Sequence, residues 1–174
     1  MSAAQPGVDT TAAISNPVTQ DARIRSLPNT EVQVIADRRA NANSGLIARA
    51  RLPAVQRSVA RAIAFAWLFA DRASLAPETS DSLAIIVEEW VMNVVEHGRA
   101  DPESLISLRL ERCDAGVRLT VSDAGRAFDP RGLVMEGPNE ERGGGAGIAL
   151  MLAWSRIIDY RRRSGRNRLV LEIG

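Results

Sequence analysis

Short segments rich in apolar residues, several of them alternating with polar ones, predict β-strands. The predicted strands are residues 32–35, 46–52, 105–111, 117–122, 158–162 and 169–173. The turn residues Asp114-Ala115-Gly116 predict a hairpin between the third and fourth of these strands. The last two strands are expected to form a closing hairpin that turns at Ser164-Gly165-Arg166-Asn167.

Apolar residues also recur at three- and four-residue spacing, which predicts amphipathic helices. The first helix covers residues 54–70, and the second begins at the capping cluster Thr79-Ser80-Asp81 and ends at about His97. A third helix is predicted over residues 148–157, after a glycine-rich stretch. This order of elements predicts a two-layer α/β sandwich, in which a mixed and mainly antiparallel sheet carries the helices on one face.

The length of 174 residues and the apolar fraction of 45% fit one globular domain. Residues 46–174 are predicted to form this domain, residues 1–30 a mobile tail, and residues 31–45 an N-terminal extension without an assigned role. The N-terminus lacks the basic and apolar regions of a signal peptide, and the longest apolar run is too short to span a bilayer. We therefore expect a soluble cytoplasmic protein.

The charged residues exclude several functions. The 22 basic and 21 acidic residues nearly balance, so the chain as a whole has no strong attraction for nucleic acid or anionic membranes. Every basic residue is arginine, and the absence of lysine excludes P-loops, kinases of the eukaryotic type and Schiff-base enzymes. Cys113 is the only cysteine, which excludes an internal disulfide and a thiolate zinc site.

The second predicted helix carries Glu89, Asn93 and His97 at four-residue spacing, in a row along the border of its apolar stripe. That stripe consists of Leu83, Val87, Trp90, Val91 and Val94. An asparagine oxygen can bind a magnesium ion that also binds phosphates, and a carboxylate one turn earlier can deprotonate an attacking hydroxyl. Taken alone, the row equally fits an ordinary solvated helix face.

Two glycine-bearing segments follow further along the chain. In Asp123-Ala124-Gly125-Arg126-Ala127-Phe128-Asp129-Pro130, the first Asp can accept a hydrogen bond from an exocyclic amine, and Gly125 allows the backbone to approach a flat ring. In Arg142-Gly143-Gly144-Gly145-Ala146-Gly147, the glycines can wrap a phosphate at the start of a helix. Each segment alone also fits a simple turn or a flexible loop.

Together the three segments stand in an order that would serve one cleft. Glu89-xxx-Asn93-xxx-His97, Asp123-x-Gly125-xx-Phe128-Asp129-Pro130 and Gly143-Gly144-Gly145-x-Gly147-Ile148 resemble the N, G1 and G2 boxes of the GHKL ATPases, the superfamily of gyrase, MutL and sensor histidine kinases. The Phe-Asp-Pro ending and the small size most resemble the bacterial anti-sigma-factor serine/threonine kinases of the partner-switching type. The resemblance covers residues 46–173 and implies the Bergerat ATP-binding fold.

The resemblance implies that ATP and Mg²⁺ are the cofactors. It assigns Mg²⁺ binding to Asn93, and it assigns the contact with the adenine amino group to Asp123. Gly125 would give the base room, and Phe128 would also line the nucleotide site. Glu89 would activate the hydroxyl of a serine on a partner protein, so that it is the catalytic residue.

The resemblance also implies a lid over the phosphates, formed by residues 143–147. Arg142 or Arg126 would supply the positive charge that lysine cannot, and Ile148 would follow the lid at the start of the next helix. His97 would lie near the triphosphate or make a structural hydrogen bond. Positioning and electrostatics would then do most of the work of phosphoryl transfer.

The implied partners are a sigma factor and a small anti-anti-sigma protein of the STAS type that is phosphorylated on serine. Such proteins often dimerise, so a homodimer is one expected state, and neither nucleic acid nor membrane is an expected partner. Three alternatives stay open. They are the ATP-binding half of a sensor histidine kinase, a non-catalytic module that holds ATP or nothing, and nucleic-acid binding through Arg161-Arg162-Arg163.

Overall fold

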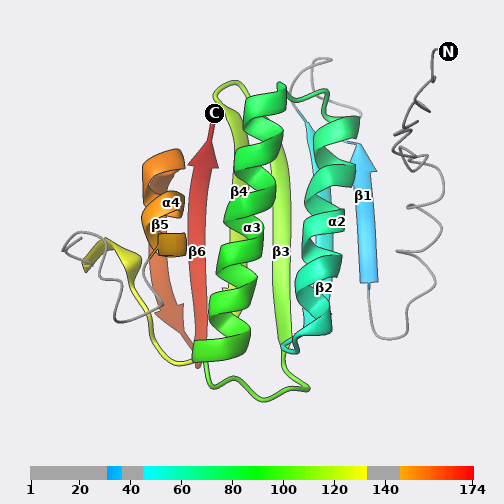
Figure 1. Cartoon of the computed structure of the whole chain (residues 1–174). Helices are drawn as coiled ribbons and strands as arrows, with labels where there is room; N and C mark the ends of the chain where they lie inside the picture. The colour runs from blue at the N-terminus through cyan, green and yellow to red at the C-terminus, as the bar shows by residue number, and fades with distance from the viewer. Residues whose placement is uncertain (1–30, 37–44, 133–145) are drawn as a thin grey trace, which may run out of the picture.

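The computed structural model describes residues 31–36, 45–132 and 146–174. The elements in chain order are β1 Glu31–Ala36, β2 Leu46–Pro53, α2 Arg57–Arg72, α3 Pro77–His97, β3 Leu105–Cys113, β4 Gly116–Asp123, the 3₁₀ helix η1 Pro130–Gly132, α4 Ala146–Trp154, β5 Arg156–Arg163 and β6 Arg166–Ile173. The strands form one six-stranded sheet in the order β1-β2-β3-β4-β6-β5, and each neighbouring pair is antiparallel. Helices α2, α3 and α4 lie on one face of this sheet (Figure 1), so the predicted two-layer α/β sandwich is confirmed.

The core lies between the sheet and the helices, because alternate strand residues and one stripe of each long helix are apolar. The largest side chains that are fully buried there include Phe65 and Phe69 of α2, Leu83 and Ile86 of α3, Leu108 and Leu110 of β3, and Leu169 and Leu171 of β6. Each such side chain contributes about 1.5–3 kcal/mol to folding when it leaves water. The predicted stripe of α3 is buried, so the rotation of this helix on the sheet is fixed and its polar row takes a defined direction.

The predicted start of α3 at the Thr79-Ser80-Asp81 cluster is wrong, because the helix begins at Pro77 with Ala76 in the capping position. A proline suits the first helical position, since its missing N–H would have no partner within the helix there. Ser80 lies inside the helix, where its hydroxyl donates to the Ala76 carbonyl at 2.9 Å instead of capping a free backbone N–H. The end of α3 at His97 is as expected.

The predicted helix over residues 148–157 ends earlier, because α4 stops at Trp154 and Arg156 already belongs to β5. The Ser155 hydroxyl donates to the Met151 carbonyl at 2.6 Å and closes the last turn of the helix. The Arg156 guanidinium then pairs with Glu172 of the neighbouring β6 at 2.7 Å. A short apolar run does not distinguish the end of a helix from the start of a strand, which explains the error.

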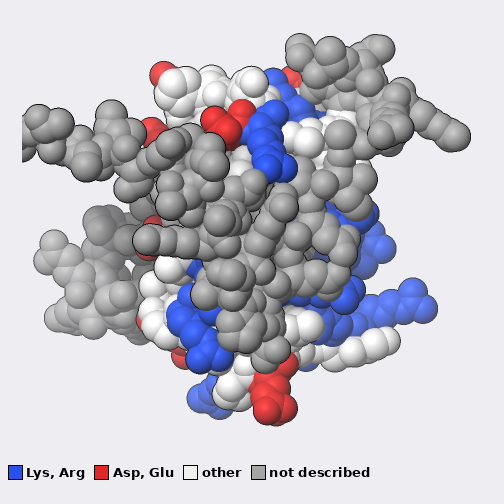
Figure 2. Space-filling model, turned by 90° about the vertical axis from the view of Figure 1, so that its right-hand side faces the viewer, with Lys and Arg blue, Asp and Glu red and all other residues white. Residues whose placement is uncertain are grey.

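Residues 1–30, predicted to be a tail, lie outside the described residues, whereas part of the predicted extension forms the edge strand β1 and pairs with β2. Among the described residues, no helix combines the length and the apolar composition that crossing a membrane requires. The side of the molecule that carries β1 shows both arginine and acidic side chains among the described residues (Figure 2), in keeping with the balanced charge of the sequence.

Candidate functional site

A small cleft that is partly open to solvent lies at the C-terminal end of α3. Its walls come from α3, from the end of β4 with the loop that follows it, and from the start of β6. The lining residues are Trp90, Asn93, Val94, His97, Gly98, Asp123, Arg126, Phe128 and Asn167. The fold therefore brings together side chains of the first two segments that the sequence singles out.

Asp123 is the last residue of β4 and is only 2% exposed, although it lines the cleft. Its Oδ1 atom accepts hydrogen bonds from the Gly125 backbone N–H at 2.8 Å and from the Asn167 amide nitrogen at 2.9 Å. No hydrogen bond from the described part of the chain reaches its Oδ2 atom. A buried carboxylate with one uncommitted oxygen is suited to accept a hydrogen bond from a ligand amine.

Gly125 packs so closely against its surroundings that a side chain would not fit without movement. A β carbon at this position would lie 2.9 Å from Asp123 Oδ1 and 3.0 Å from the Gly98 carbonyl oxygen. The next residue, Arg126, donates its backbone N–H to the same Gly98 carbonyl at 2.7 Å. The loop after β4 is therefore attached to the end of α3, and this contact closes one side of the cleft.

Asn93 is half-buried in the wall of the cleft. Within the described ranges, no hydrogen bond engages its side-chain amide. An amide oxygen in this position can complete the coordination of a magnesium ion that is held mainly by phosphates and water. Arg126 is exposed and lines the same cleft, and its guanidinium likewise has no hydrogen-bond partner among the described residues, so it can supply positive charge.

Trp90 and Phe128 form the apolar part of the cleft. Their ring centroids are 5.9 Å apart with an angle of 45° between the ring planes, a tilted arrangement that favours aromatic pairs. Trp90 is 3% exposed, and its indole N–H has no hydrogen-bond partner among the described residues. The pair forms an apolar wall beside the polar groups of Asp123 and Asn93.

Glu89 lies one helical turn before Asn93, is half-buried, and is not among the residues that line the cleft. Its carboxylate instead lies against Gly147 in the first turn of α4. Burial, followed by the negative charges of Glu88 and Glu96, raises the pKa of the Glu89 carboxyl above its usual value. A raised pKa brings a carboxylate closer to the range that suits a general base at neutral pH.

His97 closes the row on α3 and lines the open end of the cleft. Its Nε2 atom lies 3.9 Å from the Glu96 carboxylate, and the two side chains are 58% and 49% exposed. A contact this long and this open contributes little to stability.

The predicted lid lies mostly beyond what the structure describes. Arg142, Gly143, Gly144 and Gly145 fall within residues 133–145, outside the described residues. Gly147 and Ile148 belong to the first turn of α4 and do not line the cleft, and Ile148 packs against the hydrophobic core.

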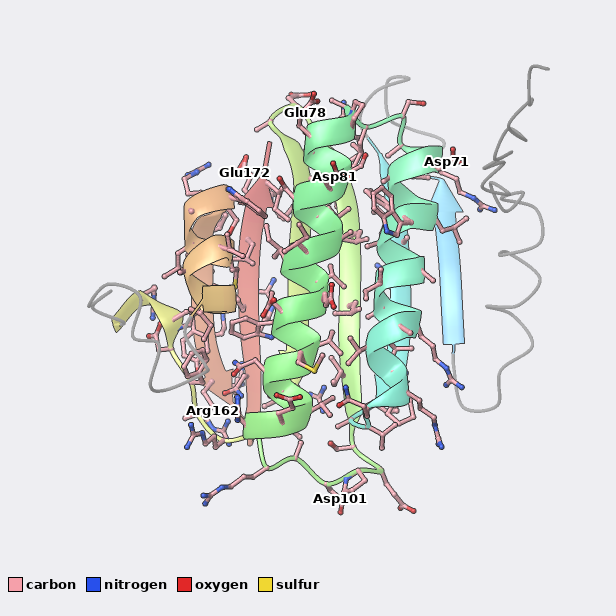
Figure 3. All side chains as sticks on the ribbon, viewed as in Figure 1. Asp71, Glu78, Asp81, Asp101, Arg162 and Glu172 are labelled. Atoms are coloured by element: carbon pink, nitrogen blue, oxygen red, sulfur yellow. The ribbon has the colours of Figure 1, made fainter. Side chains whose placement is uncertain are left out.

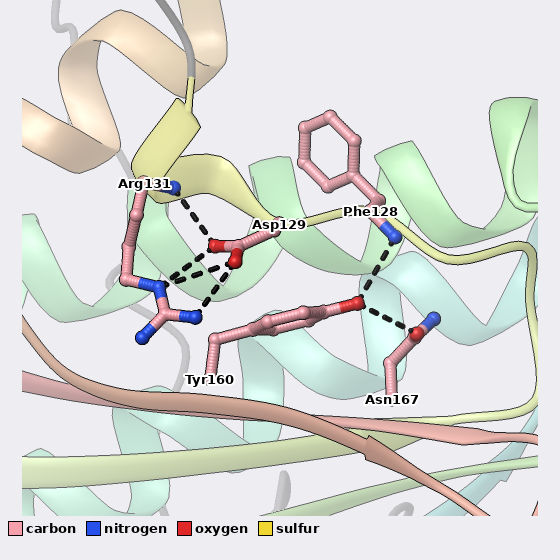
Figure 4. A network of polar contacts seen from close by, with 5 residues as sticks. All are labelled: Phe128, Asp129, Arg131, Tyr160 and Asn167. Carbon is pink, nitrogen blue, oxygen red and sulfur yellow. Dashed lines mark hydrogen bonds and ion pairs between the residues drawn. The ribbon is translucent and has the colours of Figure 1, made fainter.

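Sequence reasoning missed a buried polar residue of the cleft, Asn167, which it assigned to the closing turn. The turn consists of Ser164-Gly165, so Asn167 lies in β6 and is only 4% exposed. The Tyr160 hydroxyl donates a hydrogen bond to the Asn167 side-chain oxygen at 3.0 Å and accepts one from the Phe128 backbone N–H at 3.1 Å (Figure 4). The available signal was its position, because an asparagine in phase with Leu169 and Leu171 faces the core side of the strand.

Asp129 and Arg131 close the loop on its outer side (Figure 4). The guanidinium of Arg131 binds both oxygens of Asp129, at 2.9 Å and 2.7 Å, and lies 5.7 Å from the centre of the Tyr160 ring. The hydrogen bonds from Arg131 lower the pKa of the Asp129 carboxyl. Both residues are exposed, so the pair orders the start of η1 more than it stabilises the fold.

Comparison with known protein families shows a match that covers most of the chain. The family described as the histidine kinase-like ATPase domain matches residues 52–173, which run from the end of β2 to the end of β6. The matched region contains every residue that lines the cleft. A comparison with curated proteins gave no match.

Proposed function

Because the chain belongs to the histidine kinase-like ATPase domain family, we propose that it is an ATP-dependent protein kinase that phosphorylates a serine of a small partner protein. The family makes the chain a histidine kinase-like ATPase module. The main support for a nucleotide site is the position of Asp123, whose carboxylate is 2% exposed and yet lines the same cleft as Asn93. The choice of serine rests on the resemblance to partner-switching kinases.

The residues of the cleft fit a magnesium nucleotide. The free oxygen of Asp123 suits the exocyclic amine of adenine, and the absence of a side chain at Gly125 lets the loop pack closely against Asp123 and Gly98. At the other end, Asn93 would hold Mg²⁺ and Arg126 would face the phosphates. Mg²⁺, when bound, supplies positive charge that stabilises the phosphate oxygens during transfer.

In the proposed reaction, the serine hydroxyl oxygen of the partner forms a bond to the γ-phosphorus of ATP. The bond from that phosphorus to the oxygen bridging the β- and γ-phosphates breaks, and ADP leaves with both electrons of this bond. The hydroxyl proton passes to the carboxylate of Glu89, whose raised pKa favours its acceptance.

We further propose that the partner is a small anti-anti-sigma protein of the STAS type and that the same chain binds and inhibits a sigma factor. Nucleic acid is a poor alternative partner, because two of the three arginines of the run in β5 have partners within the protein. Arg161 pairs with Asp159, and Arg162 donates to the Gly125 carbonyl beside the cleft at 2.7 Å. These two arginines are therefore already committed to acceptors of the protein.

Mass spectrometry tests the proposal directly, after incubation of purified STAS-type proteins with the chain and Mg²⁺-ATP. We expect one phosphoserine on one partner with the wild type. Glu89→Ala should retain ATP binding and lose transfer by a factor of at least about 100, the lower range for loss of a general base. Absence of phosphoserine from every tested partner, or full activity in Glu89→Ala, would contradict the kinase assignment.

A second function is favoured by one observation, the position of Glu89 against Gly147 instead of in the lining of the cleft. The corresponding function is a regulatory module that binds ATP without transferring its phosphate. The two functions differ in the wild type itself. Binding of ATP without any phosphorylated partner or ADP release supports the module, whereas phosphoserine formation supports the kinase.

A further inference from the structure

The loop that follows β4 is held in place by side chains of the hairpin formed by β5 and β6. Asn167 donates from its amide nitrogen to the Arg126 carbonyl at 2.9 Å and to Asp123 Oδ1, also at 2.9 Å. Arg162 donates from one nitrogen, Nη1, to the Gly125 carbonyl and to the Asn167 side-chain oxygen, both at 2.7 Å. Two side chains from the C-terminal hairpin thus fix both the loop and the carboxylate.

The hydrogen-bond chemistry fixes the orientation of the Asn167 amide. Its oxygen faces the Arg162 guanidinium, which can only donate, and its nitrogen faces a carboxylate and a carbonyl, which can only accept. A flipped amide would bring oxygen against oxygen at Asp123. The amide therefore always offers an N–H to Oδ1 of Asp123, and this oxygen is committed to the protein.

Arg162 lies at the end of the molecule where α3 ends, the same end as Asp101 (Figure 3). The residue is largely exposed, but its Nη1 atom reaches inward to two acceptors of the cleft wall. The preceding residue on β5, Arg161, instead pairs with Asp159. The two neighbouring arginines therefore differ in function: one supports the cleft and the other makes an exposed ion pair.

We propose that Asn167 and Arg162 are positioning residues for base recognition in this cleft. By holding Oδ1 of Asp123 and the adjoining loop, they leave Oδ2 as the acceptor that a ligand meets. An exocyclic amine donates to this oxygen, whereas an oxo group at the same ring position places an acceptor against an acceptor. The inference rests on the proposed nucleotide binding and specifies how the protein selects a 6-aminopurine over a 6-oxopurine.

Calorimetric titration with ADP and with inosine diphosphate, both with Mg²⁺, measures this selection. We expect the wild type to prefer ADP. In Asn167→Ala the ratio of the two affinities should fall about tenfold, the effect of losing one hydrogen bond to a charged group. In Arg162→Ala it should fall about threefold, since Tyr160 still donates to Asn167.

The controls separate positioning from a general loss of structure. Arg161→Ala, at the neighbouring position, should keep the wild-type ratio. Arg162→Lys should remain within about twofold of it, because a single ammonium nitrogen can donate to both acceptors that Nη1 now serves. A purely structural role would weaken both nucleotides in proportion and leave the ratio unchanged.

The outcomes distinguish this assignment from the proposed function. If the wild type binds neither nucleotide, nucleotide binding and the positioning role are both overturned. If it binds ADP and the ratio stays unchanged in both Asn167→Ala and Arg162→Ala, only the positioning role is overturned. Should Asn167→Ala fail to fold, Arg162→Ala decides alone, because this exposed side chain contributes little to the core.

Discussion

The carboxylate of Glu89 on α3 lies against the α carbon of Gly147 in the first turn of α4. A β carbon on Gly147 would overlap this carboxylate. The position of Glu89 therefore explains why residue 147 has no side chain. The two residues are distant in sequence, and their contact joins the helix that carries Asn93 to the helix that follows the predicted lid.

A double-mutant cycle tests this contact. Alanine favours a helix over glycine by about 1 kcal/mol, but in the wild type its β carbon would displace the Glu89 carboxylate. We therefore compare the change in the free energy of unfolding that Gly147→Ala causes in two backgrounds. This change should be more stabilising by about 1 kcal/mol in Glu89→Ala than in the wild type. Denaturant unfolding of the four proteins provides the measurement. Effects that add within about 0.3 kcal/mol would show that the residues are not coupled.

The charge of Glu89 should make stability depend on pH. Its pKa is raised in the folded protein, mainly by burial and then by Glu88 and Glu96, so the ionised form is less favourable when folded than when unfolded. Glu89→Gln should have the Tm of the wild type below the usual pKa of a glutamate and a higher Tm than the wild type above the raised pKa. Thermal unfolding between about pH 4 and about pH 8 measures this. A variant that is less stable than the wild type at the upper pH would refute the expected sign.

Asn93→Ala should weaken ADP binding chiefly when Mg²⁺ is present. The amide has no partner among the described residues, so its removal should leave the fold intact and take away the oxygen that we propose binds the ion. We expect about a tenfold loss of affinity with Mg²⁺ and little change in the presence of a chelator, an effect comparable to the loss of one charge-assisted contact. Asp123→Ala serves as the comparison, because it should weaken ADP with and without the ion. Equal losses in Asn93→Ala under both conditions would exclude the metal role.

Trp90 provides an optical test of where the nucleotide binds. It is 3% exposed and lines the cleft, whereas the other two tryptophans, Trp67 and Trp154, are 41% and 40% exposed and lie elsewhere. Addition of ADP should change the tryptophan emission of the wild type, of Trp67→Phe and of Trp154→Phe. The change should disappear in Trp90→Phe. A response that persists in this last variant would place the nucleotide away from the cleft.

Local patterns predicted most of the fold because they reflect local geometry. The apolar stripe of α3 is buried as its spacing predicts, and both hairpins turn at the predicted glycine-containing segments. The ends of elements were harder, since Ser80 has the chemistry of a helix cap but lies inside α3, where Pro77 starts the helix. The role of each site residue stays a prediction, although the fold gathers Asn93, His97 and Asp123 at one cleft.

The sequence by itself determined which residue types could bind a nucleotide and in which order they follow along the chain. The glutamate-asparagine row, the Asp-x-Gly turn and the absence of lysine are properties of the residues and their spacing. Only the tertiary structure decided that Asn167 and Arg162 support Asp123, because antiparallel pairing of β4 with β6 places residues 44 positions apart side by side. Such contacts depend on which distant strands become neighbours in the sheet, and local periodicity does not contain this information. The contact between Glu89 and Gly147 depends instead on how α3 packs against α4, which local periodicity does not contain either.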